Sequence, residues 1–449
     1  MTATETLPQP VVSPGAARNQ PRRRGTCPGV LAPMAVGDGV LLRVRVPAGC
    51  LPAEHARRIA DLGHAYGNGL IDLSHRGNLQ LRGLSVDTLA PVTDALRALG
   101  YVGRDAASEA VRNVLCAPAA GLDSGAVMDV GGIARALDAR LADDAALHAL
   151  PPKFGWLVCG GGLAHLADSR TDVRFDAVDG AWLRVSLGGT RASATPLGLC
   201  PAGAVPDVAA ALGRAFLALR ATLPDPPRRM ATLVAALGPG PFAARLSPLL
   251  SPLPAGEGVG ERGSAPHLMR SFGGPVPGLA NALTVAFPFG RLTATALAAL
   301  ADAAAGIRLT PWRALLLVDP TADAGEIAAR HGGILRHDDR RLKLTACSGV
   351  TGCDVGTTDT HALALAIADR AGPLLDRVAM VHVSGCAKGC AHPGVADVTL
   401  TAHDGLYDVA LRARPGLGLP DAGVGRANLS PDDALACVVG LSAEELSGV

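Results

Sequence analysis

Four cysteines near the C-terminal end of the chain have the types and spacing of a metal or cluster site. Cys347 and Cys353 form a Cys-x5-Cys pair, and Cys386 and Cys390 form a Cys-x3-Cys pair, each among glycines and small residues. Four thiolates are the ligand set of a [4Fe–4S] cluster, and glycine-rich flanks let backbone N–H groups approach the cluster sulfides. We therefore predict a 4Fe-4S cluster and a redox role for these four residues.

Other uses of four cysteines stay open on spacing alone. Zinc also takes four thiolates, but its usual C-x2-4-C knuckles fit a five-residue gap poorly. Unligated buried thiols are a further alternative, whereas structural disulfides need an oxidising compartment that nothing in the sequence indicates. The remaining six cysteines are scattered, mostly in apolar surroundings, and are interpreted as small core residues: Cys27, Cys50, Cys116, Cys159, Cys200 and Cys437.

The elements that position these cysteines belong to an internal repeat. The segment IDLSHRGNLQL (71–81) matches IRLTPWRALLL (307–317). Upstream, VPAGCL (46–51) resembles FPFGRL (287–292), and a helical pattern follows each of these two segments. Each unit is thus predicted to run strand, helix, strand. Further along each half, a cysteine-bearing loop precedes a helical run and then a strand-like segment. The chain therefore resembles a duplication of a two-part unit.

This organisation predicts an α/β protein of the α+β type with internal pseudo-two-fold duplication. The Pro-, Gly- and Ser-rich stretch 247–264 cannot keep a periodic apolar face and is interpreted as a surface linker or insertion. The predicted units are a loose tail (1–26), a first half-repeat (27–105), a first α/β domain (106–240), a linker region (241–275), a second half-repeat (276–340) and the cysteine-bearing α/β domain (341–449).

Composition limits the classes of partner. The chain has 449 residues, 49% of them apolar, and a formal net charge of +1. Such a balance argues against a general nucleic-acid or membrane-surface binder, because those partners usually demand a basic excess. No apolar segment follows the arginine-rich start, and no run of about 18 apolar residues could span a bilayer. We expect a cytoplasmic protein, in which any charged ligand meets a local basic pocket.

A candidate for that pocket is the alternating row Arg76, Asn78, Gln80 and Arg82. Along a strand this spacing places all four polar groups on one face. Guanidinium groups bind carboxylates with two hydrogen bonds, so the row suits a polyanionic ligand. The alternative interpretation is a strand whose charges face solvent.

Together these motifs resemble the sulfite and nitrite reductase superfamily over nearly the whole chain. The resemblance rests on both cysteine pairs, RNVLC (112–116), SHRGNLQ (74–80) and PPKF (151–154), which occur in the family's order. It implies a three-domain fold with pseudo-two-fold symmetry and ferredoxin-like half-repeats. It also implies a tetrapyrrole bound by basic side chains, sirohaem in the reductases, with the last cysteine next to it. The residues it places there are Arg76, Asn78, Gln80, Arg82, Arg112 and Lys153.

Two departures from the reductases redirect the expected activity. The reductases place two lysines around the anion in a K-x-K pattern, whereas this chain has Lys153, Phe154 and Gly155; and their C-P-N-x-C loop is replaced by CAKGC (386–390). The segments CPG (27–29), 67–83 and 384–392 instead resemble the precorrin-3B synthases of aerobic cobalamin biosynthesis. That resemblance implies an O2-dependent monooxygenase that converts precorrin-3A with lactone formation. A sirohaem-dependent sulfite or nitrite reductase is the alternative, and a zinc-stabilised tetrapyrrole carrier is a third hypothesis.

The synthase resemblance also implies a mononuclear non-haem iron and NADH as ultimate electron donor. A facial triad of two histidines and a carboxylate would suit the iron, but no spacing singles out its ligands. The glycines at 160–162 and 238–240 lack a dinucleotide-binding pattern and are interpreted as turns. We therefore expect a separate electron-donor reductase, with the tetrapyrrole and O2 as the small-molecule partners. The candidate iron ligands are His75, His382, His392 and His403 with Asp354, Asp397 and Asp404, while His337 lies in a charged turn outside the motifs.

Overall fold

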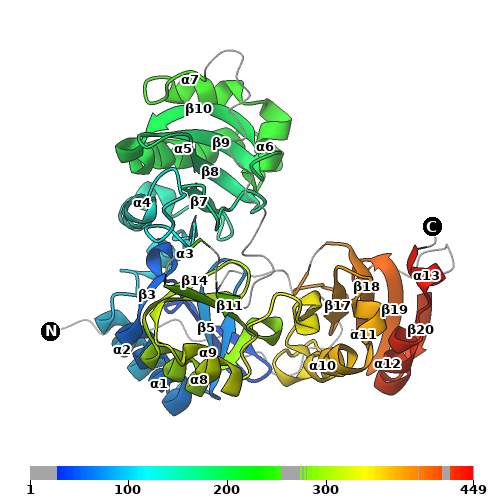
Figure 1. Cartoon of the computed structure of the whole chain (residues 1–449). Helices are drawn as coiled ribbons and strands as arrows, with labels where there is room; N and C mark the ends of the chain where they lie inside the picture. Colours follow the sequence, from blue (N-terminus) through cyan, green and yellow to red (C-terminus); the bar gives the residue numbers. More distant parts are fainter. Residues whose placement is uncertain are drawn as a thin grey trace.

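The protein consists of three lobes, shown in Figure 1 by a computed structural model. The described residues are 28–253, 274–275, 278–279, 281–392, 394–416 and 425–447. Each lobe combines helices with β-sheet, so the predicted α/β class is confirmed. The predicted tail at 1–26 and most of the predicted linker at 247–264 lie outside the described residues.

The central lobe, blue and olive in Figure 1, contains two five-stranded sheets with helices. The first sheet has the order β1-β2-β5-β4-β13, and the second has the matching order β11-β12-β15-β14-β3. The elements are β1 (Met34–Val36), β2 (Gly39–Val44), β3 (Cys50–Pro52), α1 (Ala53–Tyr66), β4 (Leu70–Leu73), β5 (Leu79–Leu84), α2 (Leu89–Ala98), β11 (Gly274–Pro275), β12 (Ala282–Ala286), β13 (Arg291–Thr293), α8 (Ala294–Asp302), β14 (Ala304–Leu309), β15 (Ala314–Pro320) and α9 (Ala324–Arg330).

The two halves of the central lobe exchange one short strand each. Strand β3 of the first half pairs with β14, placing Leu51 opposite Ile307, and β13 of the second half pairs with β4, placing Leu292 opposite Ile71. Both exchanged strands follow a short 3-10 turn, η1 (Pro47–Gly49) or η5 (Pro288–Gly290), with a left-handed residue at its second position. The predicted pseudo-two-fold duplication is confirmed, and the exchange makes the halves mutually dependent.

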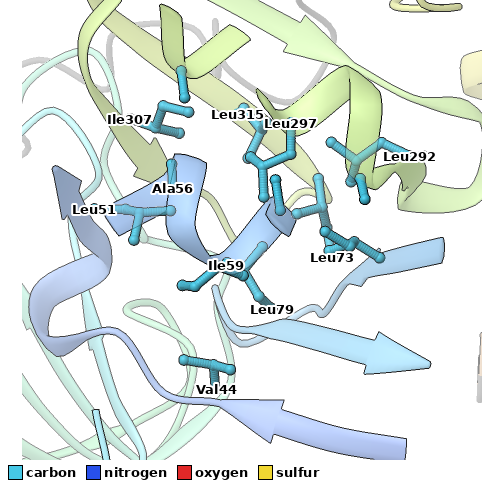
Figure 2. Close-up of a cluster of buried hydrophobic side chains, with 14 of the residues drawn as sticks. Val44, Leu51, Ala56, Ile59, Leu73, Leu79, Leu292, Leu297, Ile307 and Leu315 are labelled. Atoms are coloured by element: carbon cyan, nitrogen blue, oxygen red, sulfur yellow. The ribbon is translucent and has the colours of Figure 1, made fainter. Parts of the chain in front are cut away.

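One hydrophobic core joins the two halves. Ile59 of α1, Leu297 of α8 and Leu315 of β15 have no exposed surface, and Figure 2 shows them within one cluster of apolar side chains. Burying an aliphatic side chain of this size contributes about 1.5–3 kcal/mol. Because this core draws on both halves, separating them would expose apolar surface on each.

The second lobe, green in Figure 1, has the sheet order β10-β9-β8-β7-β6. Strands β6, β7 and β8 are parallel, and β8, β9 and β10 are antiparallel. The elements are α3 (Ala106–Ala110), β6 (Val114–Cys116), α4 (Gly131–Asp143), η2 (Ala145–Leu147), β7 (Trp156–Cys159), β8 (Thr171–Ala177), β9 (Trp182–Gly189), β10 (Thr195–Pro201), η3 (Ala202–Ala204), α5 (Val205–Arg220), α6 (Met230–Leu237) and α7 (Gly240–Leu246).

This lobe extends past residue 240, where the sequence predicted that a linker begins. Phe242 and Leu246 of α7 are fully buried in its core, and Ser251 forms a β-bridge with Leu199. The prediction was wrong at 241–251 because two well-spaced apolar residues suffice to dock a short helix. Elsewhere in the lobe, Ala202–Arg220 is the one described helical stretch long and apolar enough to span a membrane; half of its apolar window is buried within the protein.

The third lobe, orange and red in Figure 1, repeats the strand pattern of the second. Strands β16, β17 and β18 are parallel, and β18, β19 and β20 are antiparallel. The elements are η6 (Arg340–Lys343), β16 (Leu344–Ala346), η7 (Gly349–Thr351), α10 (Thr360–Arg370), α11 (Gly372–Leu375), β17 (Val381–Ser384), β18 (Ala396–His403), β19 (Leu406–Ala413), β20 (Gly425–Leu429), α12 (Pro431–Val439) and α13 (Ala443–Ser447).

The strand registers align the two outer lobes residue by residue. Cys116 lies opposite Val158 in the second lobe, and Ala346 lies opposite Val383 in the third. Cys347 therefore corresponds to the residue after Cys116, and not to Cys116 itself. The two cysteine-bearing segments therefore have equivalent strands, but their cysteines are not equivalent, since Cys116 is a buried strand residue.

Candidate functional site

The four predicted ligand cysteines gather at one edge of the third lobe's sheet. Cys347 directly follows β16, and Cys386 is the second residue after the neighbouring parallel strand β17. Cys353 lies just beyond η7, and Cys390 closes the next turn of the chain. Because carboxyl ends of parallel strands meet at the same sheet edge, the fold itself brings the two pairs together.

The cysteine thiols influence one another's ionisation. Burial, and then the charges of Cys347 and Cys353, raise the pKa of Cys386. Burial, and then the charges of Cys386, Cys347 and Cys353, raise the pKa of Cys390. Four thiolates this close repel one another, and bound metal removes that repulsion by coordinating and neutralising them. Within the described residues no three such side chains are arranged around one metal position in this structure.

The loops that carry the cysteines are packed to backbone contact. The Gly385 N–H donates to Cys347 Sγ at 3.1 Å, and a Cβ at Gly385 would lie 3.3 Å from the same sulfur. A Cβ at Gly356 would lie 2.4 Å from the backbone of Gly349. Backbone N–H groups directed at sulfur are what a cluster's sulfur shell needs. The donor set and its flanks therefore fit a [4Fe–4S] cluster, and four thiols also satisfy zinc.

Arg82 connects this loop to the first half-repeat. Its guanidinium donates to Asp38 (2.9 and 2.8 Å), to Asp72 (3.0 Å) and to the Gly352 carbonyl (2.7 Å). Its side chain is only 3% exposed. The sequence placed Arg82 toward a tetrapyrrole, but its donors are directed at internal partners. The motif gave no sign of this, because Asp38 and Gly352 are remote from Arg82 in sequence.

Asp72 extends this connection into the second half-repeat. Arg291 donates to both of its carboxylate oxygens, at 2.6 and 3.1 Å, and also to Ser348 Oγ at 3.2 Å. Burial alone would raise the pKa of Asp72, but the hydrogen bonds and charges of Arg291 and Arg82 hold it below its ordinary value. Arg82 and Arg291, one from each half-repeat, therefore bind the Asp72 carboxylate and also contact the Cys347–Cys353 loop. We call Asp38, Asp72, Arg82 and Arg291 together the Arg82 clamp.

The predicted row of polar side chains on one strand face does not form. Strand β5 begins only at Leu79; Arg76 and Asn78 lie in the preceding turn, where Gly77 adopts a φ of 60° and Ser74 Oγ accepts both of their N–H groups. Gln80 is on β5 and accepts from Arg43 at 2.8 Å. The alternation was misread because a glycine in the left-handed region reverses the chain inside the motif.

Two of the predicted basic residues do come together between the lobes. Arg76 Nη2 donates to the Lys153 carbonyl at 3.1 Å, and Arg229 donates to the same oxygen. The Lys153 side chain is exposed. These three cations, two from the second lobe and one from the central lobe, lie at the junction that we call the basic surface, where Arg229 also pairs with the buried Asp172 at 3.0 Å.

Arg112 has a different role from the one expected. Its Nε and Nη2 donate to Asp138 of α4 at 2.8 and 2.7 Å, and the pair is buried. The carboxylate that pairs with Arg112 is therefore one of the protein's own and not one of a bound ligand. Sequence reasoning missed a second buried cation, Arg45, which is 3% exposed and lies 3.8 Å from Glu109. The RVRV run at 43–46 was the available signal, since a charge every second residue in an apolar strand needs a partner.

The candidate iron ligands separate into two groups. His75, His382 and His392 lie near Cys390: the rings of His382 and His392 are 5.9 Å apart, and His75 Nε2 lies 3.3 Å from the Ala391 carbonyl. His403 lies away from them, with Nε2 3.0 Å from Asp408. Of the carboxylates, Asp397 accepts the N–H groups of two residues before β17, and Asp404 occupies the β18–β19 turn.

Comparisons with known proteins give one family by sequence and the corresponding fold by structure. A sequence profile of the nitrite/sulfite reductase ferredoxin-like half domain matches residues 32–99. The chain is 32% identical to a precorrin-3B synthase from a Sinorhizobium species over 84% of this chain and 80% of that one. It is 28% identical to a ferredoxin–nitrite reductase of Synechococcus elongatus over 80% of this chain and 75% of that one.

Among solved structures, the Mycobacterium tuberculosis NirA protein shares the fold. It superposes with a TM-score of 0.64 at 23% identity and covers 89% of this chain and 79% of its own. The three-domain reductase-like fold predicted from the motifs is confirmed. With the duplicated sheets, the cysteine quartet and the extended similarity all in agreement, the chain belongs to the precorrin-3B synthase family within the nitrite and sulfite reductase superfamily.

Proposed function

We propose that this protein is an O2-dependent monooxygenase that converts precorrin-3A to precorrin-3B. The substrate gains one oxygen atom at a meso carbon, and a ring acetate closes a lactone. The second oxygen atom of O2 takes up two electrons and two protons and leaves as water, and NADH is the ultimate electron donor. The reaction is therefore precorrin-3A + O2 + NADH + H⁺ → precorrin-3B + NAD⁺ + H2O.

The observation that carries this choice is the segment Lys153 to Gly155. Where the reductases have a second lysine, Gly155 has no side chain, and its N–H donates to the buried Asp172 at 2.9 Å. A Cβ there would lie 3.2 Å from Thr171 Oγ1, so a longer side chain would have to displace a neighbour. A site for a small multiply charged anion would lack one cation here, which disfavours sulfite or nitrite as substrate.

The residues of the site suit a bound tetrapyrrole with carboxylate substituents. Arg76 and Arg229 both donate to the backbone carbonyl of Lys153, whose own side chain is exposed at the junction of two lobes. Guanidinium and ammonium groups attract carboxylates and orient them. Arg82 and Arg112 support this surface indirectly, because Arg82 fixes the loop at Gly352 and Arg112 fixes helix α4. Asn78 supports it from the turn before β5, and Gln80 supports it from β5 itself.

Electron supply follows from the cysteine quartet. A [4Fe–4S] cluster held by Cys347, Cys353, Cys386 and Cys390 would deliver single electrons, and a mononuclear non-haem iron would supply the O2 chemistry. The glycines at 160–162 lie in the turn after β7, and Gly238 ends α6. We propose that NADH is oxidised by a separate reductase in the cytoplasm, with no nucleic acid or membrane as partner.

Anaerobic purification tests this proposal against the alternatives. Labile sulfide at about four per chain with iron in excess of it by about one, no sirohaem spectrum, and ¹⁸O from ¹⁸O2 in a product one oxygen heavier than precorrin-3A are the expected results. A stoichiometric sirohaem with sulfite- or nitrite-dependent electron uptake would establish the reductase instead. Zinc without labile sulfide would leave only a tetrapyrrole carrier.

A further inference from the structure

We propose that Arg313 binds a carboxylate of the tetrapyrrole and forms, with His382 beside it, a second carboxylate subsite on the third-lobe side of the turn 74–78. The subsite rests on the proposed function, which supplies the tetrapyrrole, and it adds a second point of attachment to the basic surface. A carboxylate is the matching ligand, because a guanidinium binds it with parallel hydrogen bonds and a neutral imidazole offers one further N–H donor.

The turn that carries Arg313 repeats the turn 74–78 of the first half. Thr310 Oγ1 accepts the N–H groups two and four residues later, at 3.3 and 3.2 Å, and Ser74 Oγ accepts in the same way at 3.3 and 3.1 Å. Arg313 takes the place of Gly77, and both residues have a φ of 60°. A side chain is strained in this conformation, and strained residues are concentrated at binding sites and active sites. The chain therefore keeps an arginine where the fold alone favours glycine.

The Arg313 guanidinium has donors that the protein does not use. Its Nη1 donates to the Phe289 carbonyl at 3.2 Å, whereas its Nε is buried and has no partner within the described part of the chain. Burial lowers the pKa of Arg313, and the charges of Asp72 and Cys347 act in the opposite direction. Both oxygens of Asp72 already accept from two other arginines. Because the Arg313 side chain is partly exposed, a ligand carboxylate can reach its remaining donors and offset the cost of its burial.

His382 is a second buried group without a partner. Its side chain has no exposed surface, and neither ring nitrogen makes a hydrogen bond to the described residues. Val381 and Val383, its neighbours on β17, belong to the third lobe's apolar core, so His382 lies on the opposite face of the strand. Burial, and then the charges of His392 and Arg313, lower the pKa of His382 to about 4, so the ring is neutral at neutral pH. A carboxylate bound at Arg313 would bring this ring an acceptor that the described residues do not supply.

The surroundings of Arg313 suit an anion and not a metal ion. Burial, and then the charge of Arg313, lower the pKa of His75 to about 4, and the ring nitrogens of His75 face the carbonyls of Ala391 and Pro311. Within the described residues no three His, Cys, Asp or Glu side chains surround one metal position. The guanidinium is the fixed charge among these neutral rings, and it attracts carboxylates and repels cations.

The turn 74–78 lies between the basic surface and the new subsite. His75 contacts the carbonyl of Ala391 in the third lobe, and Arg76, the next residue, donates to the carbonyl of Lys153 in the second. A macrocycle whose carboxylates reach the basic surface on one side of this turn and the new subsite on the other is held at two points. A rigid ligand held at two points has a fixed orientation, so one edge of the macrocycle is presented to the cysteine quartet.

The test measures precorrin-3A binding to the full-length protein with its cluster reconstituted, under anaerobic conditions that prevent turnover. Arg313→Gly removes the guanidinium and gives the turn the residue that the first half has at this position, so the fold should be kept. We expect the Kd to rise by about 10- to 100-fold, the loss expected for one charge-assisted hydrogen-bond partner. Arg313→Lys, which keeps the charge, should give an intermediate Kd. Labile sulfide and the thermal unfolding midpoint should stay near the wild-type values in both variants.

Arg336→Ala is the matched control, because Arg336 is an exposed arginine of the third lobe that pairs with Asp338. It should bind precorrin-3A like wild type. An equal loss of affinity in this control, or an Arg313→Gly variant that binds precorrin-3A within about twofold of wild type, would overturn the subsite. A shift in the reduction midpoint of the cluster with unchanged precorrin-3A affinity would overturn it too, because Arg313 would then act on the cluster alone.

The subsite and the proposed function can fail separately. If wild type oxygenates precorrin-3A and Arg313→Gly binds it equally well, the subsite falls and the function stands. If Arg313→Gly loses affinity as described and wild type incorporates no oxygen from ¹⁸O2, the subsite stands and the function falls. If wild type instead retains sirohaem, the function falls, and sirohaem occupancy of Arg313→Gly decides the subsite: a loss supports it, and equal occupancy overturns it.

Discussion

The Arg82 clamp gives the sharpest prediction, because sequence and structure assign Arg82 different roles. In the Arg82→Ala variant, Asp38 loses its guanidinium partner, and the Gly352 carbonyl loses a charged donor at 2.7 Å. Asp72 keeps Arg291. Removing one partner of a buried ion pair costs about 3–5 kcal/mol, and the retained Arg291 places this case near 3 kcal/mol.

Loss of the clamp should act first on the cysteine loop. Gly37, at the turn beside Asp38, lies so close that a Cβ on it would be 2.9 Å from the backbone of Cys353. We therefore expect Arg82→Ala to lower the free energy of unfolding by about 3 kcal/mol, followed in urea by the visible absorption of the cluster and by far-ultraviolet circular dichroism. Arg82→Lys should restore part of the loss, because one ammonium cannot reach all three acceptors.

The matched control is Arg336→Ala, which removes an arginine–aspartate pair on the exposed surface of the third lobe. It should leave the urea midpoint unchanged. The reasoning would be refuted if Arg82→Ala matched wild type within about 0.5 kcal/mol, the range of ordinary surface changes. It would also be refuted if the urea transition of the cluster absorption were unchanged and only the affinity for the tetrapyrrole fell. That result is expected of a residue that binds the substrate directly.

Three further predictions test the other assignments. Cys353→Ser should abolish the cluster, measured as labile sulfide, whereas Cys437→Ser, in the apolar core of the third lobe, should retain it. Asp72 has a depressed pKa, so its contribution to stability is present above the ordinary value of about 4 and is lost as pH falls through the folded-state value. Asp72→Asn should therefore reduce the loss of stability that wild type shows as pH falls below about 4. Arg112→Ala should destabilise the second lobe in thermal unfolding by about 3–5 kcal/mol, because Asp138 would be left buried without its partner.

The duplication could be predicted from sequence because it is written in local apolar patterns. Ile71 and Ile307 occupy equivalent positions in both the repeat and the sheets. The strand exchange could not be predicted, since β3 and β13 have only three residues each and pair with the other half. Helix α7 was missed for a related reason, as its two core residues stand among prolines and small residues.

At the site, residue types were predicted better than residue roles. The cysteine spacing predicted a shared site, whereas the parallel pairing of β16 and β17 that brings the quartet to one sheet edge was not predicted. The roles of Arg82 and Arg112 depend on Asp38, Asp138 and the Gly352 carbonyl, and no local pattern identifies such partners. An arginine's ligand is decided by which carboxylate the fold brings within about 3 Å, so a basic motif predicts a cation and leaves its partner undetermined.

The pseudo-symmetry relates the cysteine quartet of the third lobe to the equivalent strand ends of the second lobe. Both lobes present the carboxyl ends of β6–β7 and β16–β17 in the same arrangement. In the third lobe these ends carry Cys347 and Cys386, while in the second the equivalent ends are Ala117 and Gly161. The central lobe then contributes one turn, 74–78, that contacts Lys153 of the second lobe through Arg76 and Ala391 of the third through His75. Two adjacent residues of a single turn thus link the basic surface of the second lobe to the Cys390–His392 segment of the third, so under the proposed function this turn would fix the distance between a bound tetrapyrrole and the cysteine quartet.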